Sequence, residues 1–408
     1  MKQQNTQLSQ KRYLPQAMEQ AESDKTYSGR LEHTPNRQVN SKTCWVIALC
    51  FMLCCGMQAQ NPMDRSEVKR VMKSVADWQT DHMTELKYSA ADWVYATFYL
   101  GLTKWAAVAE KEDGDASYYD WLVGMGNHIG WQPEKRMYHA DDVCVCQTYL
   151  DLYRKYHDKR MFQPTEARLS WVVAHPSLGS FLLDHRDYTT LERWTWCDAL
   201  FMAPATYARI YRITGDEKYL DFMNEEYRAT YDFLFDKEEH LFYRDHHFIG
   251  KKETNGKKVF WGRGNGWVIG GLVEILRELP AGHKSRPFYE SLFKEMATCV
   301  AGLQQSDGFW RASMLDPKSY PSPETSSSGF FVYGLAYGIN EGLLPLDTFL
   351  PVVEKGWKAL CSAVEEDGKL GYVQPIGRDP QKVTRELTEA YGPGAFLMAG
   401  TEILKMAK

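Results

Sequence analysis

The sequence lacks the features that mark several large classes of protein. Its 48 lysine and arginine residues are outnumbered by 53 aspartate and glutamate residues, and no basic cluster is interleaved with aromatic residues. We therefore expect no nucleic-acid partner, because such surfaces need a basic patch. The five cysteines that follow residue 59 are an odd number without CxxC spacing, so neither a disulfide framework nor a zinc site is predicted.

Common cofactor and nucleophile motifs are also missing. There is no Walker loop, no strand-linked GxGxxG and no GxSxG, so we expect no cofactor. The spacings of His139, His246 and His247 match no common metal motif, and no metal is predicted. Aromatic residues, in contrast, are abundant at 13%, with 13 tryptophans and 24 tyrosines. Such a composition is common where sugar rings are stacked.

The N-terminal part of the chain differs from the rest. A polar stretch is followed by the apolar run "WVIALCFMLCC", which is too short to span a membrane with its polar flanks, and then by small and polar residues. This order predicts that residues 1–59 are an extension with a secretory signal cleaved near Ala59, rather than a lipoprotein signal through Cys54 or Cys55. We expect residues 60–408 to form one catalytic domain without a membrane span, secreted across the inner membrane into the periplasm.

The chain after residue 59 has few strand-like alternations and many apolar runs of helical period, which predicts an all-α fold. Amphipathic segments alternate with segments rich in glycine, alanine and aromatic residues, as expected for outer and inner helices. Their spacing of roughly 50 to 70 residues favours an α/α six-hairpin barrel over an open solenoid, whose repeats are shorter and more uniform. The six predicted inner segments begin at Trp93, Asp142, Trp196, Gly264, Ser326 and Gly392.

In a closed ring the starts of the inner helices point to one mouth, and three carboxylates stand at such starts. Asp141 and Asp142 occur in "YHADD", where N-capping is the alternative to a catalytic role. Asp198 occurs in "RWTWCDALFM", among aromatic and apolar residues. A carboxylate there either pairs with an arginine or is a proton donor with a raised pKa, and we favour the donor.

The stretch "WGRGNGW", residues 261–267, combines the flat rings of two tryptophans, three glycines that let the backbone approach a ligand closely, and the guanidinium of one arginine. It predicts a wall for a planar acidic ligand, made by Trp261, Arg263 and Trp267. The alternative is a buried helix start, with Trp267 in the core and Arg263 in an ion pair. Arg244 could likewise pair with a substrate carboxylate or with its neighbour Asp245.

Several long motifs in order resemble glycoside hydrolase family 105, the unsaturated rhamnogalacturonyl hydrolases and related unsaturated glucuronyl hydrolases. They are "YHADDVCVCQTYLDLY", "HPSLGSF", "RWTWCDALFMAPATYARIYRITGD", "LFYRD", "WGRGNGW" and "YPSPETSSSGFFVYGLAYGINEGLL". Together they span nearly all of the chain after the signal. A histidine that some members carry near "LFY" is replaced here by Arg244.

The resemblance implies an α/α barrel that removes a 4,5-unsaturated uronic acid from the non-reducing end of lyase-generated acidic oligosaccharides. In this chemistry an aspartic acid protonates C4, water adds at C5, and the hemiketal opens to release the aglycone. The aspartate that acts as acid and base in the family corresponds to Asp198 of this sequence. The family's second aspartate corresponds to a residue of "YHADD", and we choose Asp141 over Asp142. The expected substrate-binding residues are Trp261, Arg263, Trp267, Asp142, His139, Arg244, Trp196, Trp93 and Glu324.

Two other functions fit the same barrel. One is a non-catalytic carbohydrate-binding protein, since a fold alone does not establish chemistry. A buried Asp198 argues against it. The other is a different sugar enzyme, such as an epimerase with histidine bases, for which His139 is the one histidine close to an inner-helix start. The sugar that follows the uronate and the oligomeric state are left open.

Overall fold

The computed structural model describes residues 63–407, and the predicted signal, residues 1–59, lies outside them. Regular structure in the described part is almost wholly helical. Two short strands, β1 (Phe235–Asp236) and β2 (Leu241–Phe242), form an antiparallel hairpin in which Phe235 faces Phe242. The all-α prediction is confirmed. No helix between residues 63 and 407 is both long and apolar enough to cross a membrane.

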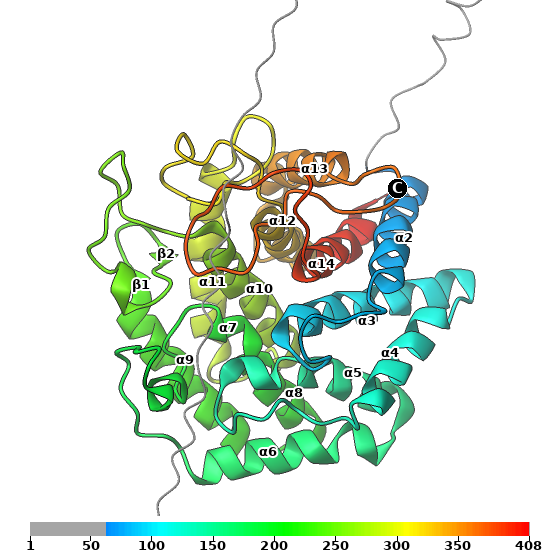
Figure 1. Ribbon diagram of the computed structural model, residues 1–408, viewed down its shortest axis with the longest axis vertical. Helices are drawn as coiled ribbons and strands as arrows, with labels where there is room; N and C mark the ends of the chain where they lie inside the picture. The colour runs from blue at the N-terminus through cyan, green and yellow to red at the C-terminus, as the bar shows by residue number, and fades with distance from the viewer. Residues whose placement is uncertain (1–62, 408) are drawn as a thin grey trace, which may run out of the picture. The chain divides into compact units, whose positions relative to one another are not determined.

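Six inner helices follow one another around a closed ring (Figure 1). Each packs against the next one along the chain, and the last packs against the first, which confirms the predicted six-hairpin barrel. The inner helices are α3 (Trp93–Asp113), α5 (Cys146–Tyr156), α8 (Pro204–Thr214), α10 (Gly262–Glu278), α12 (Thr325–Asn340) and α14 (Tyr391–Met406).

The inner segment predicted from Trp196 is divided in two. The short helix α7 (Ala199–Met202) ends just before Pro204, where α8 begins. Proline has no N–H to donate and its ring clashes with the preceding turn, so it starts a helix more readily than it continues one. Asp198 stands directly before α7 as a result.

The outer helices have one buried and one charged face. In α2, Val68, Met72 and Val75 are buried, and the carboxylate of Asp64 caps the helix by accepting from the N–H groups of Ser66 and Glu67 at 3.0 and 3.2 Å. Such helices cover the ring because only one of their faces is apolar. They are α2 (Arg65–Asp81), α4 (Ser117–His128), α6 (Gln163–Ala174), α9 (Lys218–Leu234), α11 (Arg286–Gly302) and α13 (Leu346–Ser362).

Helices α3 and α14 close the ring through glycines. A methyl group at Gly101 would lie 2.4 Å from the carbonyl oxygen of Gly394, and one at Gly394 would lie 2.5 Å from that of Thr97. No side chain fits at such distances, so the two backbones can meet only because both positions lack one.

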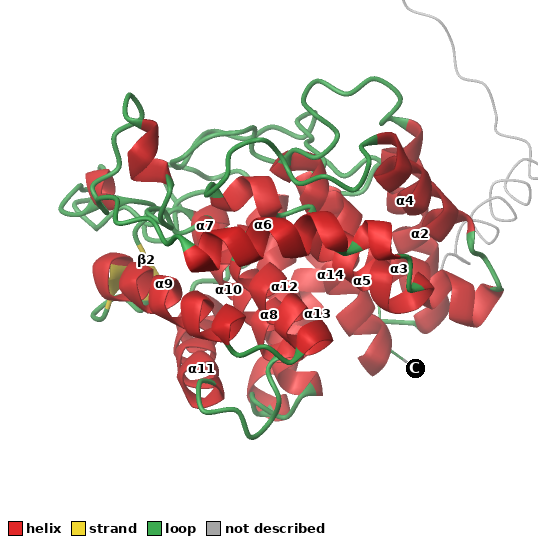
Figure 2. Ribbon diagram, turned by 90° about the horizontal axis from the view of Figure 1, so that it is seen from below, coloured by secondary structure: helices red, strands yellow, loops and turns green. Residues whose placement is uncertain are grey.

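The long connections all precede inner helices, as in residues 129–145, 235–261 and 363–390, whereas the turns that follow inner helices are short. Figure 2 shows the long loops gathered on one side of the helices. The N-terminal ends of the inner helices therefore open into a mouth that these loops surround.

A buried ionic network joins the inner helices away from the mouth. Glu274 of α10 is fully enclosed and pairs with Lys104 of α3 at 2.9 Å and Arg209 of α8 at 2.5 Å, and it accepts a hydrogen bond from Tyr333 of α12. Arg209 also pairs with Asp151 of α5 at 3.0 Å. A further pair, between Arg277 of α10 and Glu402 of α14, brings in the sixth inner helix.

We predict that Glu274→Gln destabilises the fold by ~3–5 kcal/mol, because Lys104 and Arg209 would remain buried without their shared counter-charge. Chemical denaturation measures the loss. The control is Asp221→Asn, which removes an exposed pair with Lys284 and is expected to cost less than ~1 kcal/mol. Equal losses in the two variants would show that the network contributes no more than a surface pair.

Candidate active site

The mouth of the ring brings together two carboxyl groups from neighbouring inner elements. Asp198 stands before α7, and Asp141 lies in the 3-10 turn η1 (Ala140–Val143) that leads into α5. Helix α7 packs against η1, and the charge of Asp198 adds to the effect of burial in raising the pKa of Asp141. Residues 57 positions apart in the sequence thus share one local environment.

The side chain of Asp198 is enclosed, and its carboxyl group does not cap the helix α7 that follows it. Its residue is 8% exposed, and its Oδ1 accepts from the Sγ of Cys197 at 3.3 Å and lies 3.8 Å from the Nε of Arg244. Burial raises the pKa of Asp198, and the nearby Arg244 guanidinium only partly opposes this rise. A carboxyl group in this setting holds its proton more tightly than a free aspartic acid.

Asp141 also has a perturbed environment. Burial raises the pKa of Asp141 to about 8, against the opposing charge of Arg136. The Nδ1 of His139 accepts from the Asp141 N–H at 3.3 Å, and the imidazole packs on Trp196 with ring centres 4.9 Å apart. Because burial also lowers the pKa of His139 to about 3, this imidazole is neutral at pH 7 and orients the turn.

The neighbouring Asp142 is committed to protein contacts. Its Oδ1 accepts from the Nε and Nη2 of Arg136 at 3.0 and 2.5 Å, and its Oδ2 accepts from the Arg136 N–H at 2.6 Å. The residue is 2% exposed. Between the two candidates of "YHADD", this geometry favours Asp141 for chemistry and Asp142 for shaping the turn.

Arg244 links Asp198 to a second buried acid. Its Nη1 donates to Asp245 at 2.7 Å, while its Nε has no hydrogen-bond partner among the described residues. Asn265, in the first turn of α10, fixes the strand that precedes Arg244, because its side chain bonds both the N–H and the C=O of Phe242, at 2.8 and 3.1 Å. The glycine-rich motif therefore sets the position of the arginine beside Asp198.

The rest of "WGRGNGW" faces the protein interior. Trp267 is fully buried and packs on Phe201 and Phe330, with ring centres 5.0 and 4.6 Å apart. Arg263 is fully buried too, and it donates to the backbone carbonyls of Gln374 and Pro375 at 2.5 and 2.9 Å. This enclosure favours a supporting role for both residues over direct contact with a ligand.

Trp261 and Glu324 support the same loop. The Nε1 of Trp261 donates to the Oε1 of Gln374 at 3.1 Å. The carboxylate of Glu324 accepts from the N–H groups of Ser327 at 2.8 Å and Gln374 at 3.0 Å, so that it caps α12 and holds the loop. Both residues are buried. The hydroxyl of Tyr391 completes the arrangement by donating to the Gln374 carbonyl at 2.6 Å.

Gln374 and Tyr391 are thus structural residues of the site that the sequence reasoning missed. Tyr391 stands at an inner-helix start, in "TEAYGPG", and that position was its signal. Gln374 lies in a loop without periodicity or motif, so no local pattern could have found it.

Trp93 is the partly exposed aromatic residue among the predicted binding residues, whereas Trp196, Trp261 and Trp267 are buried. Its ring stacks on that of Tyr391, with centres 5.5 Å apart and planes 17° apart. A cavity of about 550 Å³ lies next to His139, between residues 136–139 and 188–192, and Trp93 is not part of its lining. Partial exposure alone makes Trp93 the tryptophan of these four that is best suited to stack on a sugar ring.

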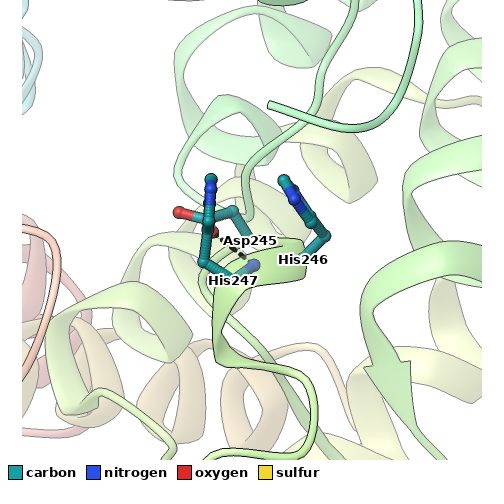
Figure 3. Close-up of side chains that lie close together, drawn as sticks. All are labelled: Asp245, His246 and His247. Carbon is teal, nitrogen blue, oxygen red and sulfur yellow. Dashed lines mark hydrogen bonds and ion pairs between the residues drawn. The ribbon is translucent and has the colours of Figure 1, made fainter. Parts of the chain in front are cut away.

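One cluster brings together groups of the kinds that bind metals. Asp245, His246 and His247 place one potential ligand atom each within 4.8 Å of the others (Figure 3). Both oxygens of Asp245 already accept hydrogen bonds, from Arg244 at 2.7 Å and from the His247 ring at 2.9 Å. The carboxylate of Asp245 is therefore already used to position Arg244. A metal cation bound there would be repelled by the positive charge of the Arg244 guanidinium.

Comparison with known proteins relates this chain to one kind of chemistry. The sequence model of Glycosyl Hydrolase Family 88 matches residues 66–407. A relative from Formosa agariphila, named unsaturated 3S-rhamnoglycuronyl hydrolase, is 38% identical over 375 residues, 88% of this chain and 98% of its own. This name falls in the class of unsaturated uronyl hydrolases that the motifs predicted, although the matching model carries the number 88 and not 105.

Solved structures share the fold. A Glycosyl hydrolase family 88 protein from Bacteroides vulgatus superposes with a TM-score of 0.75 at 30% identity, over 84% of this chain and 99% of its own. A structure described as a polysaccharide lyase also has a TM-score of 0.75, at 32% identity, over 84% of this chain and 98% of its own.

We predict that Asp141→Asn stabilises the folded protein, increasingly so as pH rises from ~4 to 8. With a folded pKa of about 8, Asp141 keeps its proton in this window while the unfolded chain, with a pKa near ~4, loses it. Wild-type stability therefore falls through the window by up to ~1.4 kcal/mol per pH unit, and the asparagine variant lacks this loss.

Thermal melts of both proteins between pH 4 and 8 check this. Asp142→Asn is the control, because it breaks the ion pair with Arg136 and should lower Tm. A constant difference in Tm between wild type and Asp141→Asn across the window would contradict a raised pKa at Asp141.

Proposed function

Because the chain belongs to Glycosyl Hydrolase Family 88, we propose that Asp198 and Asp141 are the groups that carry out its chemistry. The enzyme is a glycoside hydrolase that removes the 4,5-unsaturated uronic acid from the non-reducing end of oligosaccharides left by polysaccharide lyases. The observation that carries the assignment is the pair of carboxyl groups at the mouth, whose pKa values are both raised by burial.

Asp198 is the proton donor in this proposal. Its buried carboxyl group gives the proton to C4 of the ring, and the positive charge that develops at C5 is quenched by water, whose oxygen bonds to C5. As Asp198 becomes a carboxylate, the Arg244 Nε at 3.8 Å stabilises the new negative charge. Asp141, in its protonated form, accepts a hydrogen bond from that water through its carbonyl oxygen, and the water gives one proton to the Asp198 carboxylate as its oxygen bonds to C5, which restores the donor. The hemiketal at C5 then opens, and the aglycone leaves as an alcohol.

Binding of the planar unsaturated ring rests on groups around this pair. Trp93 provides the partly exposed aromatic face, and the Arg244 side chain, which is 14% exposed, provides positive charge near the uronate carboxylate. Since the Formosa agariphila relative is named for a rhamnoglycuronyl substrate, we propose rhamnose as the sugar that is released.

The structure described as a polysaccharide lyase raises a second candidate function. A lyase would create the unsaturated uronate, whereas the hydrolase consumes it. The two differ in the sign of the absorbance change near the unsaturated-uronate band. The buried proton donor favours consumption, because β-elimination starts with a base that must be ionised.

We predict that Asp198→Asn folds normally and lowers turnover by ~10²–10⁴, as expected for the loss of a general acid. The assay follows loss of absorbance on lyase-generated oligosaccharides, with Asp221→Asn as the control for a surface substitution. In heavy water the wild type should place deuterium at C4, and its rate should decline at alkaline pH as the donor loses its proton. Near-normal turnover in Asp198→Asn would remove this residue from the chemistry.

We also propose that the enzyme acts in the periplasm after removal of residues 1–59. The apolar run followed by small residues supports this. N-terminal sequencing of protein recovered from the periplasmic fraction of an expressing bacterium should begin just after Ala59. An unprocessed chain in the cytoplasmic fraction would contradict the proposal.

A further inference from the structure

A cavity lies at the end of the barrel opposite the mouth, where the proposed reaction makes no use of it. It has a volume of about 460 Å³ and is formed by the start of α2 and the C-terminal parts of α3, α10 and α14. Helix α10 rises by about 21 Å between Arg263, beside the active-site loops, and Arg277, which lines this cavity. We call it the basal cavity.

Positive side chains dominate the lining of the basal cavity. Five cations line it against two acids, namely Arg65, Lys104, Lys111, Arg277 and Lys405 against Glu112 and Glu402. The excess remains when each ion pair of the lining is followed outward through its partners. The partners add three cations and four acids, which are Lys69, Arg154 and Arg209, and Asp113, Asp151, Glu274 and Glu278. Eight cations then stand against six acids.

The excess positive charge belongs to Lys111 and Lys405. Lys111 has no ion pair among the described residues, and Lys405 shares the carboxylate of Glu402, at 2.9 Å, with Arg277. The two lysines stand in the last turns of α3 and α14, where a helix end favours a cation. Each helix end carries only about half a negative charge, so positive charge is left for a ligand.

The other cations of the basal cavity are crowded and held in place. Burial lowers the pKa of Lys104, the charge of Glu274 opposes this effect, and the charges of Arg277 and Arg209 add to it. The Nε of Arg277 donates to the hydroxyl of Tyr333 at 3.3 Å, and its Nη2 donates to Glu402. The guanidinium is therefore positioned by the core before any ligand binds, which lowers the cost of binding.

The lining also indicates the chemistry of a ligand. None of the described residues that form the basal cavity is aromatic, which disfavours a stacked sugar ring. Ala107, Val108 and Leu404 form an apolar part of the wall, and the volume is larger than a bare oxyanion fills. A ligand with a strongly charged head and a small apolar body matches both parts of the wall.

We propose that the basal cavity binds a phosphate monoester, with the phosphate among the cations and the organic group against the apolar wall. A phosphate monoester carries close to two negative charges at neutral pH and offers three acceptor oxygens. The guanidinium of Arg277 and the ammonium groups of Lys111 and Lys405 can donate to these oxygens. The ligand would join α3, α10 and α14 and so stabilise the closed ring.

The test measures binding to the wild-type protein by titration calorimetry at low salt. Phenyl phosphate is the probe, and phenyl sulfate is the matched ligand, because it has a similar shape and carries one negative charge. We expect phenyl phosphate to bind at one site and at least ~10-fold more tightly than phenyl sulfate. Inorganic phosphate, which lacks the organic group, should bind more weakly than phenyl phosphate.

Two double variants with the same net charge locate the site. Lys111→Met/Lys405→Met should weaken the binding of phenyl phosphate ~10- to 100-fold. This variant leaves no acid unpaired, because Glu402 keeps its pair with Arg277. The control is Lys318→Met/Lys358→Met, which removes two exposed lysines outside the cavity and should bind as wild type does. Phenyl phosphate should also raise the Tm of wild type and of the control, and not that of Lys111→Met/Lys405→Met.

Each result decides the proposal. Equal losses in the two double variants would show that binding follows net charge alone and would overturn the site. Unchanged binding in Lys111→Met/Lys405→Met would place the ligand elsewhere, and absence of binding to wild type would overturn the site as well. Phenyl sulfate binding as tightly as phenyl phosphate would overturn the preference for two charges, and inorganic phosphate binding as tightly would overturn the ester. No turnover is measured, so the outcome is independent of the proposed function.

Discussion

The carboxylate of Glu274 lies enclosed where four inner helices meet, and the closed ring depends on it. Lysine, arginine and tyrosine side chains from α3, α8 and α12 all converge on this one acid. A buried ion group contributes little net stability compared with apolar packing, but leaving one of its charges unpaired is costly. We interpret the network as fixing the order and register of the inner helices, since a helix shifted by one turn would strand a charge in the core.

The mouth of the barrel forms because the ring of inner helices is closed. Once the six inner helices are held side by side, their N-terminal ends lie on one side, and the long loops that precede them are gathered there (Figure 2). The backbone contact between Gly101 and Gly394 leaves no gap between the first and last inner helices. Asp141 and Asp198 lie on neighbouring elements because of this architecture, and burial raises the pKa of each carboxyl group.

The first turns of α10 serve the site indirectly. Arg263 and Trp261 hold one loop through Gln374, and Asn265 holds the strand before Arg244. Fully buried side chains lose no further freedom when a ligand binds, so the groups they place are ready before substrate arrives. A motif of three glycines, two tryptophans, one arginine and one asparagine therefore supports the site without facing it.

Much of the molecule was determined by the sequence alone, because the signals were local. The alternation of amphipathic and wholly apolar helices predicted the barrel, and the apolar neighbours of Asp198 predicted a protonated acid. The tertiary structure decided what depended on distant partners. Asp141 and Asp142 are equivalent as a sequence pattern, and only the contact of Arg136 with Asp142 and the packing of η1 on α7 separate their roles. Arg263 looked like a ligand-binding residue until its guanidinium met the carbonyl of Gln374, which lies 111 positions away in the chain. The folded backbone determines which side chain or carbonyl group a residue contacts. Neither the periodicity nor the motifs of a sequence indicate contacts between residues so far apart in the chain.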